Sequence, residues 1–288
     1  MKRWGIILLL ALLTAGCGQP KQKVRIETNL PPVDFSIKPP AENLEFTVEG
    51  SQVMEVMGTN MESSYRFQWR AGNWRDEDDG SRTATVRFSK VAARERRGQM
   101  ATLEPIKSFD RLEGFSTKYR LDAEGFAPVA EPARDEDFMM AFTTLSQGLS
   151  ALDFRWPEAQ HAPGEEWTIV MDVSELGPMS EIAQDSIVHL KYTGNQVYKG
   201  RNCARLEARL SIPLDGRIEQ GPATSHVVGS IESTVTRLFD LEKHFFILTK
   251  HESVLKIKGQ DFDEEGKALG GEKNFAQNGF FEITYLGF

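Results

Sequence analysis

Apolar residues alternate with polar ones along several segments of this chain, and this pattern restricts the fold more than any other feature. Two triplets of large apolar side chains occupy every second position: Tyr65, Phe67 and Trp69 in the first half, and Val188, Leu190 and Tyr192 in the second. A period of two places such side chains on one face of a β-strand. Turns that contain Gly or Asp separate the alternating segments. The sequence therefore predicts a mainly β fold of antiparallel strands.

The two halves of the chain resemble each other at a nearly constant offset of about 120 residues. Residues 45–48 read EFTV and residues 166–169 read EWTI, and the dipeptide Gly-Asn recurs at 72–73 and at 194–195. We expect two related antiparallel β units, in the form of curved sheets or half-barrels. The alternative is that β-rich sequences share alternation and glycine turns without any duplication.

A helix is expected between the two units. Five apolar residues recur there at steps of three and four: Phe138, Phe142, Leu145, Leu149 and Leu152. This spacing predicts one packing α-helix with an apolar face against a sheet. The expected organisation is a first β-rich unit at 45–133, a linker with the helix at 134–162, and a second β-rich unit with C-terminal strands at 163–288.

The N-terminus has the features of an export signal. Lys2 and Arg3 carry positive charge, residues 4–13 are largely apolar, and small residues at 14–16 precede Cys17. The apolar stretch is too short to cross a bilayer, which takes about 20 residues. Residues 1–16 are therefore predicted to be a signal peptide.

A cysteine directly after such a segment resembles the lipobox of bacterial lipoproteins, in which the thiol is acylated and the cysteine becomes the new N-terminus. Ala15 and Gly16 fit that motif, whereas Leu13 lies one position further from Cys17 than is usual. The resemblance implies lipid, such as palmitate, on Cys17, attachment to a membrane, and a place in the cell envelope. Gly18 instead of Asp implies the periplasmic face of the outer membrane in a Gram-negative organism. An ordinary secretion signal is the alternative.

Residues 17–44 are predicted to be the lipidated N-terminus and a tether. They contain several prolines and little periodicity, which is typical of a semi-rigid spacer. The alternative for part of this segment is an edge strand at Val33–Ile37.

The charge and the cysteine content narrow the functional classes. The formal net charge of −8 repels nucleic-acid phosphates, so no nucleic-acid partner is expected. If Cys17 carries lipid, the other cysteine, Cys203, has no partner for a disulfide. We expect Cys203 to be an inert thiol at a strand end; a reactive thiolate near Arg205 is the alternative.

The layout is similar to uncharacterised bacterial lipoprotein families. They share a lipobox, a tether, two β-rich units, and a Leu-rich linker that leads through Pro to a Gly-Glu/Asp-x-Trp start, here Gly164 to Trp167. A curved antiparallel sheet with one helix is also similar, more distantly, to the envelope lipoprotein-carrier and receptor families. That resemblance implies a concave sheet that holds acyl chains, although fold alone does not determine function.

One acidic segment has the spacing of a calcium-binding loop. Asp261, Asp263 and Glu265 lie at its first, third and fifth positions, Gly266 at the sixth and Glu272 at the twelfth. Oxygen ligands at alternate positions and a final bidentate Glu are what Ca²⁺ requires. The same residues are equally typical of a solvated hairpin turn.

No sequence motif predicts a catalytic residue or a cofactor. We expect a non-catalytic protein that binds an apolar ligand or another envelope protein. The candidate residues of a ligand cavity are aromatic side chains: Phe67, Trp69, Phe138, Phe142 and Trp167. The alternatives are that these residues form a packed sheet face, that the chain is an enzyme whose site is assembled from distant residues, or that it is a scaffold.

Overall fold

The computed structural model describes residues 26–35, 43–56, 58–98, 102–122, 125–130, 135–139, 141–142, 160–171, 173, 179–220, 223–263 and 265–287. Cys17, the predicted lipid attachment site, lies outside these residues, as do the expected helix positions Leu145, Leu149 and Leu152. No helix in the described part is long and apolar enough to span a membrane.

In the described part of the first half of the chain, the elements with defined bounds are strands and the short helix α2. These are β1 (Val33–Asp34), β2 (Leu44–Val56), β3 (Thr59–Asp76), β4 (Arg82–Arg97), β5 (Glu104–Pro105), α2 (Lys107–Asp110), β6 (Ser116–Asp122) and β7 (Gly125–Pro128). The second half adds β8 (Gln160–His161), β9 (Glu166–Met171), β10 (Ser186–Tyr198), β11 (Arg201–Gln220), β12 (Ala223–Asp240), β13 (Phe245–Phe262) and β14 (Lys273–Tyr285). The expected mainly β class is confirmed.

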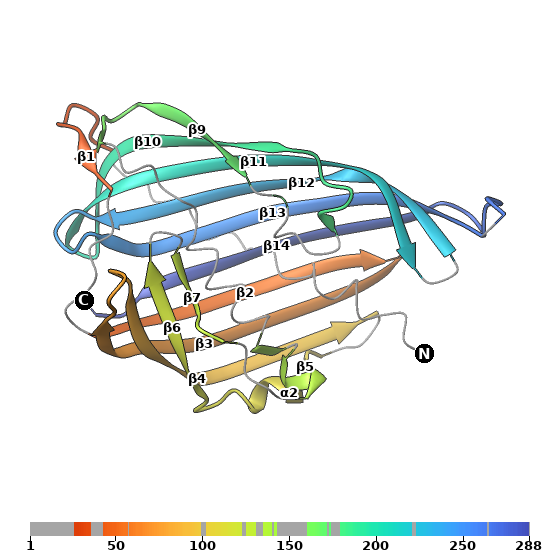
Figure 1. Ribbon diagram of the computed structural model, residues 1–288, viewed down its shortest axis with the longest axis horizontal. Helices are drawn as coiled ribbons and strands as arrows, with labels where there is room; N and C mark the ends of the chain where they lie inside the picture. The colour runs from red at the N-terminus through yellow and green to blue at the C-terminus, as the bar shows by residue number, and fades with distance from the viewer. Residues whose placement is uncertain are drawn as a thin grey trace.

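Nearly all of these strands belong to one antiparallel sheet. Its order is β7-β6-β4-β3-β2-β14-β13-β12-β11-β10-β9, with β5 added beside β4. The sheet is open, with β7 and β9 at its two ends. Figure 1 shows the long strands side by side in a curved layer, with β6 and β7 crossing at a steep angle to them. A small second sheet pairs β1 with β8.

Each of the two expected units forms a meander in chain order. The first unit supplies β2, β3, β4, β6 and β7, and the second supplies β9 to β13, running in the same direction along the sheet. The last strand, β14, pairs with β13 on one side and with β2 on the other. One continuous sheet thus spans both units. This arrangement agrees with a duplication, which stays a prediction from the sequence.

The N-terminal segment, expected to be a tether, lies against the sheet at residues 26–35. Phe35 is buried and makes edge contacts with Tyr192 and Phe239 at centroid distances of 5.2 and 5.4 Å. Glu27 exchanges backbone hydrogen bonds with Asn195 at 2.8 and 2.9 Å. Residues 26–35 of the predicted tether (17–44) are therefore docked on the sheet. The strand given as the alternative for part of this segment is present as β1.

A glycine permits this close approach. Gly194 has φ of 131°, and a Cβ atom there would lie 2.3 Å from the backbone oxygen of Glu27. An L-residue would be strained and would displace the N-terminal segment. The Gly-Asn pair that marked the repeat in the sequence thus has a structural role in its second copy.

Helical residues 136–139 and 141–142 pack on the β2–β4 half of the sheet, as the sequence predicts for the start of the linker helix. Phe138 and Phe142 are buried in the same apolar cluster as Phe67, Phe88 and Trp69. The Phe142 ring meets the Phe88 ring edge-on at 6.2 Å. The Asp135 side chain accepts a hydrogen bond from the Phe138 N–H at 3.1 Å, which satisfies one of the free donors at a helix start.

Candidate ligand-binding face

The strand register places alternate residues of β10–β14, β2 and β3 on one side of the sheet, here called the inner face. Paired residues in an antiparallel ladder project to the same side. One transverse row comprises Leu206, Arg237, Thr249, Ile283, Val48 and Phe67. The next row comprises Leu190, Ala208, Val235, His251, Phe281, Gly50 and Tyr65. The inner face thus continues across seven neighbouring strands.

Most of the inner face on β10–β13 is apolar. Its buried aliphatic side chains form one cluster, which contains Val188, Leu190, Leu210, Ile212, Leu214, Val227, Ile231, Val235 and Leu255. The same strands carry exposed polar residues at the intervening positions, among them His189, Arg209, Glu232, Glu252 and Lys256. Of the described residues outside the strands, Met179, Ile182 and Ala183 pack in this cluster. The sheet is therefore strongly two-sided.

Arg237, Thr249 and His251 are polar residues of the inner face that lie together at the centre of the sheet, and they are here called the polar cluster. Further along the same face lie four other buried polar residues: Ser233, Ser253, Gln52 and Gln277. Arg237 and Thr249 are direct partners across β12 and β13, and His251 follows two residues later on the same side. Their exposed fractions are 0%, 1% and 7%. Within the described residues, the Thr249 hydroxyl and both ring nitrogens of His251 are buried and make no hydrogen bond.

Apolar groups surround the polar cluster. The Arg237 guanidinium lies 4.9 Å from the centre of the Phe246 ring, in cation–π geometry. The His251 ring meets the Phe281 ring edge-on at 5.1 Å. Burial, and then the positive charge of Arg237, lower the pKa of His251 to about 4. His251 is therefore neutral at pH 7 and offers one N–H donor and one acceptor nitrogen.

Tyr65 extends over the neighbouring strand in the same row. A Cβ atom on Gly50 would lie only 2.2 Å from Cζ of the Tyr65 ring. Glycine at this inward position of β2 thus leaves space for the phenol to reach towards β14. Burial raises the pKa of the Tyr65 hydroxyl above its ordinary value, so it stays protonated.

Four of the five predicted cavity residues lie together. Phe67, Trp69, Phe138 and Phe142 belong to one buried cluster, where Trp69 stacks on Phe46 at 4.6 Å. These rings pack on one another, as the alternative of a packed sheet face requires. Whether they also line a ligand cavity remains a prediction.

The fifth predicted cavity residue lies apart from the others. Trp167 is on β9, at the opposite end of the sheet from β4, and stacks on the His161 ring at 3.9 Å. The structure does not bring Trp167 to the cluster of Phe67, because β2 and β10–β14 lie between β3 and β9 in the sheet.

The predicted calcium loop forms the turn between β13 and β14. The Asp261 carboxylate accepts hydrogen bonds from Ser225 Oγ at 2.6 Å and from the Lys273 ammonium. The hydrogen bond from Lys273, and then the one from Ser225, lower the pKa of the Asp261 carboxyl group. Asp263 accepts hydrogen bonds from the backbone N–H groups of Glu265 and Lys267 at 3.1 and 2.8 Å. Both carboxylates are thus engaged within the turn.

The remaining predicted calcium ligands do not converge on these two. Glu265 is exposed, and Glu272 lies 3.3 Å from the Lys258 ammonium. Among the described residues, no group of three or more His, Cys, Asp or Glu side chains is placed to hold a metal ion. The observed contacts are those of a hairpin turn.

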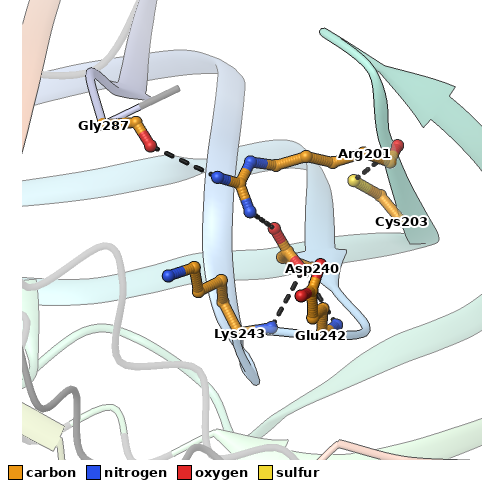
Figure 2. Close-up of polar contacts among 6 residues, drawn as sticks. All are labelled: Arg201, Cys203, Asp240, Glu242, Lys243 and Gly287. Atoms are coloured by element: carbon orange, nitrogen blue, oxygen red, sulfur yellow. Dashed lines mark hydrogen bonds and ion pairs between the residues drawn. The ribbon is translucent and has the colours of Figure 1, made fainter.

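A charged network at the other end of the long strands lies beside Cys203 (Figure 2). The side chain of Arg201 forms an ion pair with Asp240 at 3.0 Å and reaches the backbone oxygen of Gly287 at 3.4 Å. Cys203 Sγ lies 3.5 Å from the backbone oxygen of Arg201. Burial, and then the nearby Asp240 charge, raise the pKa of the Cys203 thiol to about 12.

We expect the Cys203 thiol to be unreactive in the folded protein, because only the thiolate attacks electrophiles. With Cys17 replaced by Ser, a maleimide probe at pH 7 labels the chain only after urea unfolds it. Labelling of the native protein at the rate of the unfolded protein would show a reactive thiol instead.

Sequence reasoning missed the polar cluster. The available signal was the interruption of apolar alternation on the segments that form β12 and β13, where Arg237 follows Val235, and Thr249 and His251 follow Ile247. A buried Arg at an inward strand position breaks the binary pattern and is therefore informative. The sequence does not show, however, that β12 and β13 pair in the register that joins these residues.

Comparison with known proteins identifies the fold. No protein-family model matches the chain, and no curated protein matches its sequence. Among solved structures, lipovitellin, from work on its lipid–protein interactions, matches with a TM-score of 0.50 and 10% identity over 86% of this chain. This chain spans 25% of the lipovitellin chain. A DUF1329 family protein from Desulfovibrio piger matches with a TM-score of 0.18 and 7% identity, over 86% of this chain and 85% of that chain. At such identity, the likeness to lipovitellin concerns the fold alone.

Proposed function

We propose that the protein binds the acyl chain of a lipid on its inner face. The observation that carries this proposal is the breadth of that face: aliphatic side chains from β10 to β13 form one continuous buried surface. A surface of this kind matches a hydrocarbon chain in shape and polarity. Lipovitellin, a quarter of which is similar in fold to this chain, is a protein whose lipid–protein interactions have been studied, and this agrees with the same class of ligand.

We further propose that a lipid on Cys17 holds the domain at the membrane, in the cell envelope and, in a Gram-negative organism, at the periplasmic face of the outer membrane. Nine residue steps separate Cys17 from Ile26, the first described residue, and they span at most about 30 Å. Residues 26–35 then lie against the sheet. The anchor would therefore keep the inner face close to the bilayer, where lipids are available.

A bulky substitution on the inner face tests the proposal. Ala208 lies between Leu190 and Val235 in the row of His251. Ala208→Trp would occupy space that an acyl chain otherwise fills, so we expect lipid binding to be lost while the lipid-free protein stays folded. The measurements are displacement of a fluorescent fatty acid and the thermal unfolding of the delipidated protein.

Arg209→Trp is the matched control, because Arg209 is the next residue and is exposed on the opposite side of β11. It should bind the fatty acid as the unmodified protein does. If Ala208→Trp instead unfolds the lipid-free protein, the face is a filled core, since overpacking costs about 1–3 kcal/mol. That result would contradict the proposal.

A further inference from the structure

Thr249 and His251 of the polar cluster are maintained at a cost to the fold. A buried hydroxyl or imidazole that makes no protein hydrogen bond destabilises the folded state. Valine in place of Thr249, or phenylalanine in place of His251, would fill similar space without that cost. Neighbouring inward positions such as Val235 and Ile283 are apolar. Departures from the pattern of a packed core are expected at functional sites.

Thr249 and His251 present hydrogen-bond donors to the inner face, and the guanidinium of Arg237 adds positive charge beside them. Arg237 is permanently charged, Thr249 has a hydroxyl, and neutral His251 has one N–H. On β10–β14 and β2, the inner-face positions from the row of Leu206 to the row of Ile212 include no Asp or Glu. This combination of donors suits an oxyanion, because charge-assisted hydrogen bonds to carboxylate or phosphate are the strong ones.

The surroundings restrict the kind of anion. Within the same two rows the flanking residues are Leu206, Val235, Phe281 and Ile283, all of them apolar. A small hydrated anion would lose its water here without gaining apolar contacts. An anion at the end of a hydrocarbon chain would gain both contacts with the polar cluster and burial of the chain.

We propose that the polar cluster binds the acidic head group, carboxylate or phosphate, of an amphipathic lipid whose acyl chain lies on the aliphatic cluster of β10–β13. This inference rests on the proposed function, because it names the class of lipid that the inner face binds. The chain would run over Leu210, Ile212 and Ile231, which follow the cluster along β11 and β12.

Ligands that differ only in the head group test the inference. The mature chain with Cys17→Ser is titrated below the micellar concentration with palmitate, with hexadecanol, with lysophosphatidic acid and with inorganic phosphate. We expect palmitate or lysophosphatidic acid to bind about tenfold or more tightly than hexadecanol. The better of the two identifies the head group as carboxylate or phosphate.

Shape-preserving variants assign that preference to the cluster. Thr249→Val and His251→Phe should leave the affinity for hexadecanol unchanged, reduce the preference for the acidic lipid about tenfold or more, and leave the melting temperature of the lipid-free protein equal or higher. Thr234→Val is the control, because Thr234 is exposed on the other side of β12. Arg237→Met should also reduce the preference for the acidic lipid. If that variant does not fold, Thr249→Val and His251→Phe alone show whether the preference depends on the polar cluster.

Each outcome separates the two proposals. Equal affinity for palmitate, lysophosphatidic acid and hexadecanol would contradict recognition of an acidic head group and leave acyl-chain binding intact. The same conclusion would follow if Thr249→Val and His251→Phe kept the full preference for the acidic lipid. No binding of any of the three lipids would overturn both. Inorganic phosphate that binds as tightly as the acidic lipids would show an anion site without a lipid, and would also overturn the inference.

Discussion

Asp240→Ala is expected to destabilise the protein by about 3–5 kcal/mol, because removal of one partner leaves the remainder of a buried charged network unsatisfied. The Asp240 side chain is 1% exposed, and one of its oxygens lies 3.0 Å from the guanidinium of Arg201. Its other oxygen accepts hydrogen bonds from the N–H groups of Glu242 and Lys243 at 2.9 and 3.0 Å (Figure 2). Urea unfolding at pH 7 measures the loss.

Two further variants separate the contributions to this effect. Asp240→Asn keeps an oxygen acceptor for the turn but removes the charge, so it should lose less stability than Asp240→Ala. Asp215→Ala is the control, because the carboxylate of Asp215 lies 3.2 Å from His226 in a largely exposed pair, and such pairs contribute about 0–1 kcal/mol. If Asp240→Ala loses no more stability than Asp215→Ala, the network does not hold β11, the β12–β13 turn and the C-terminus together.

Acid is expected to destabilise the protein through His251. Its pKa lies at about 4 in the folded protein against an ordinary value of 6.5, chiefly because burial disfavours the charged ring. The unfolded chain therefore binds the proton first. This contribution to stability is complete above pH 6.5 and is lost as the pH falls towards 4, by roughly 3 kcal/mol.

His251→Phe isolates this effect. The variant has no group to protonate at that position, so its free energy of unfolding should fall less steeply between pH 7 and pH 4 by roughly the same 3 kcal/mol. Carboxylates common to both proteins cancel in the comparison. Parallel pH profiles of the two proteins would mean that His251 is accessible to protons in the folded state, in conflict with its burial.

The sequence was sufficient for the fold class because alternation is a local property. The inward phase of Phe67 and Trp69, and that of Val188 and Leu190, could be assigned from spacing alone, since side chains alternate across any β-strand. The helix start at Phe138 was likewise visible from its period.

Long-range pairing was not available from the sequence. Nothing local states that β14 lies between β13 and β2, although this pairing unites the two units in one sheet. The docking of residues 26–35 depends on a backbone contact between Glu27 and Asn195, which side-chain pattern does not encode. Prolines in this segment indicated a spacer, but buried contacts of Phe35 outweigh that local preference.

The candidate site, like the fold, was predictable from the sequence only where the signal is local. The large aromatic residues were found because they are conspicuous in sequence, and four of them do gather. Arg237, Thr249 and His251 were missed because each is unremarkable alone and acquires meaning only through the β12–β13 register. Buried polar residues on an apolar face are defined by their neighbours, which tertiary structure supplies.

Native mass spectrometry of the Cys17→Ser protein, purified from an envelope extract without added lipid, tests the central claim most directly. We predict a non-covalent adduct with the mass of an acidic acyl lipid, present in this protein and in Arg209→Trp, and absent from Ala208→Trp. Bare masses for all three proteins, or an adduct that Ala208→Trp retains, would contradict lipid binding on the inner face.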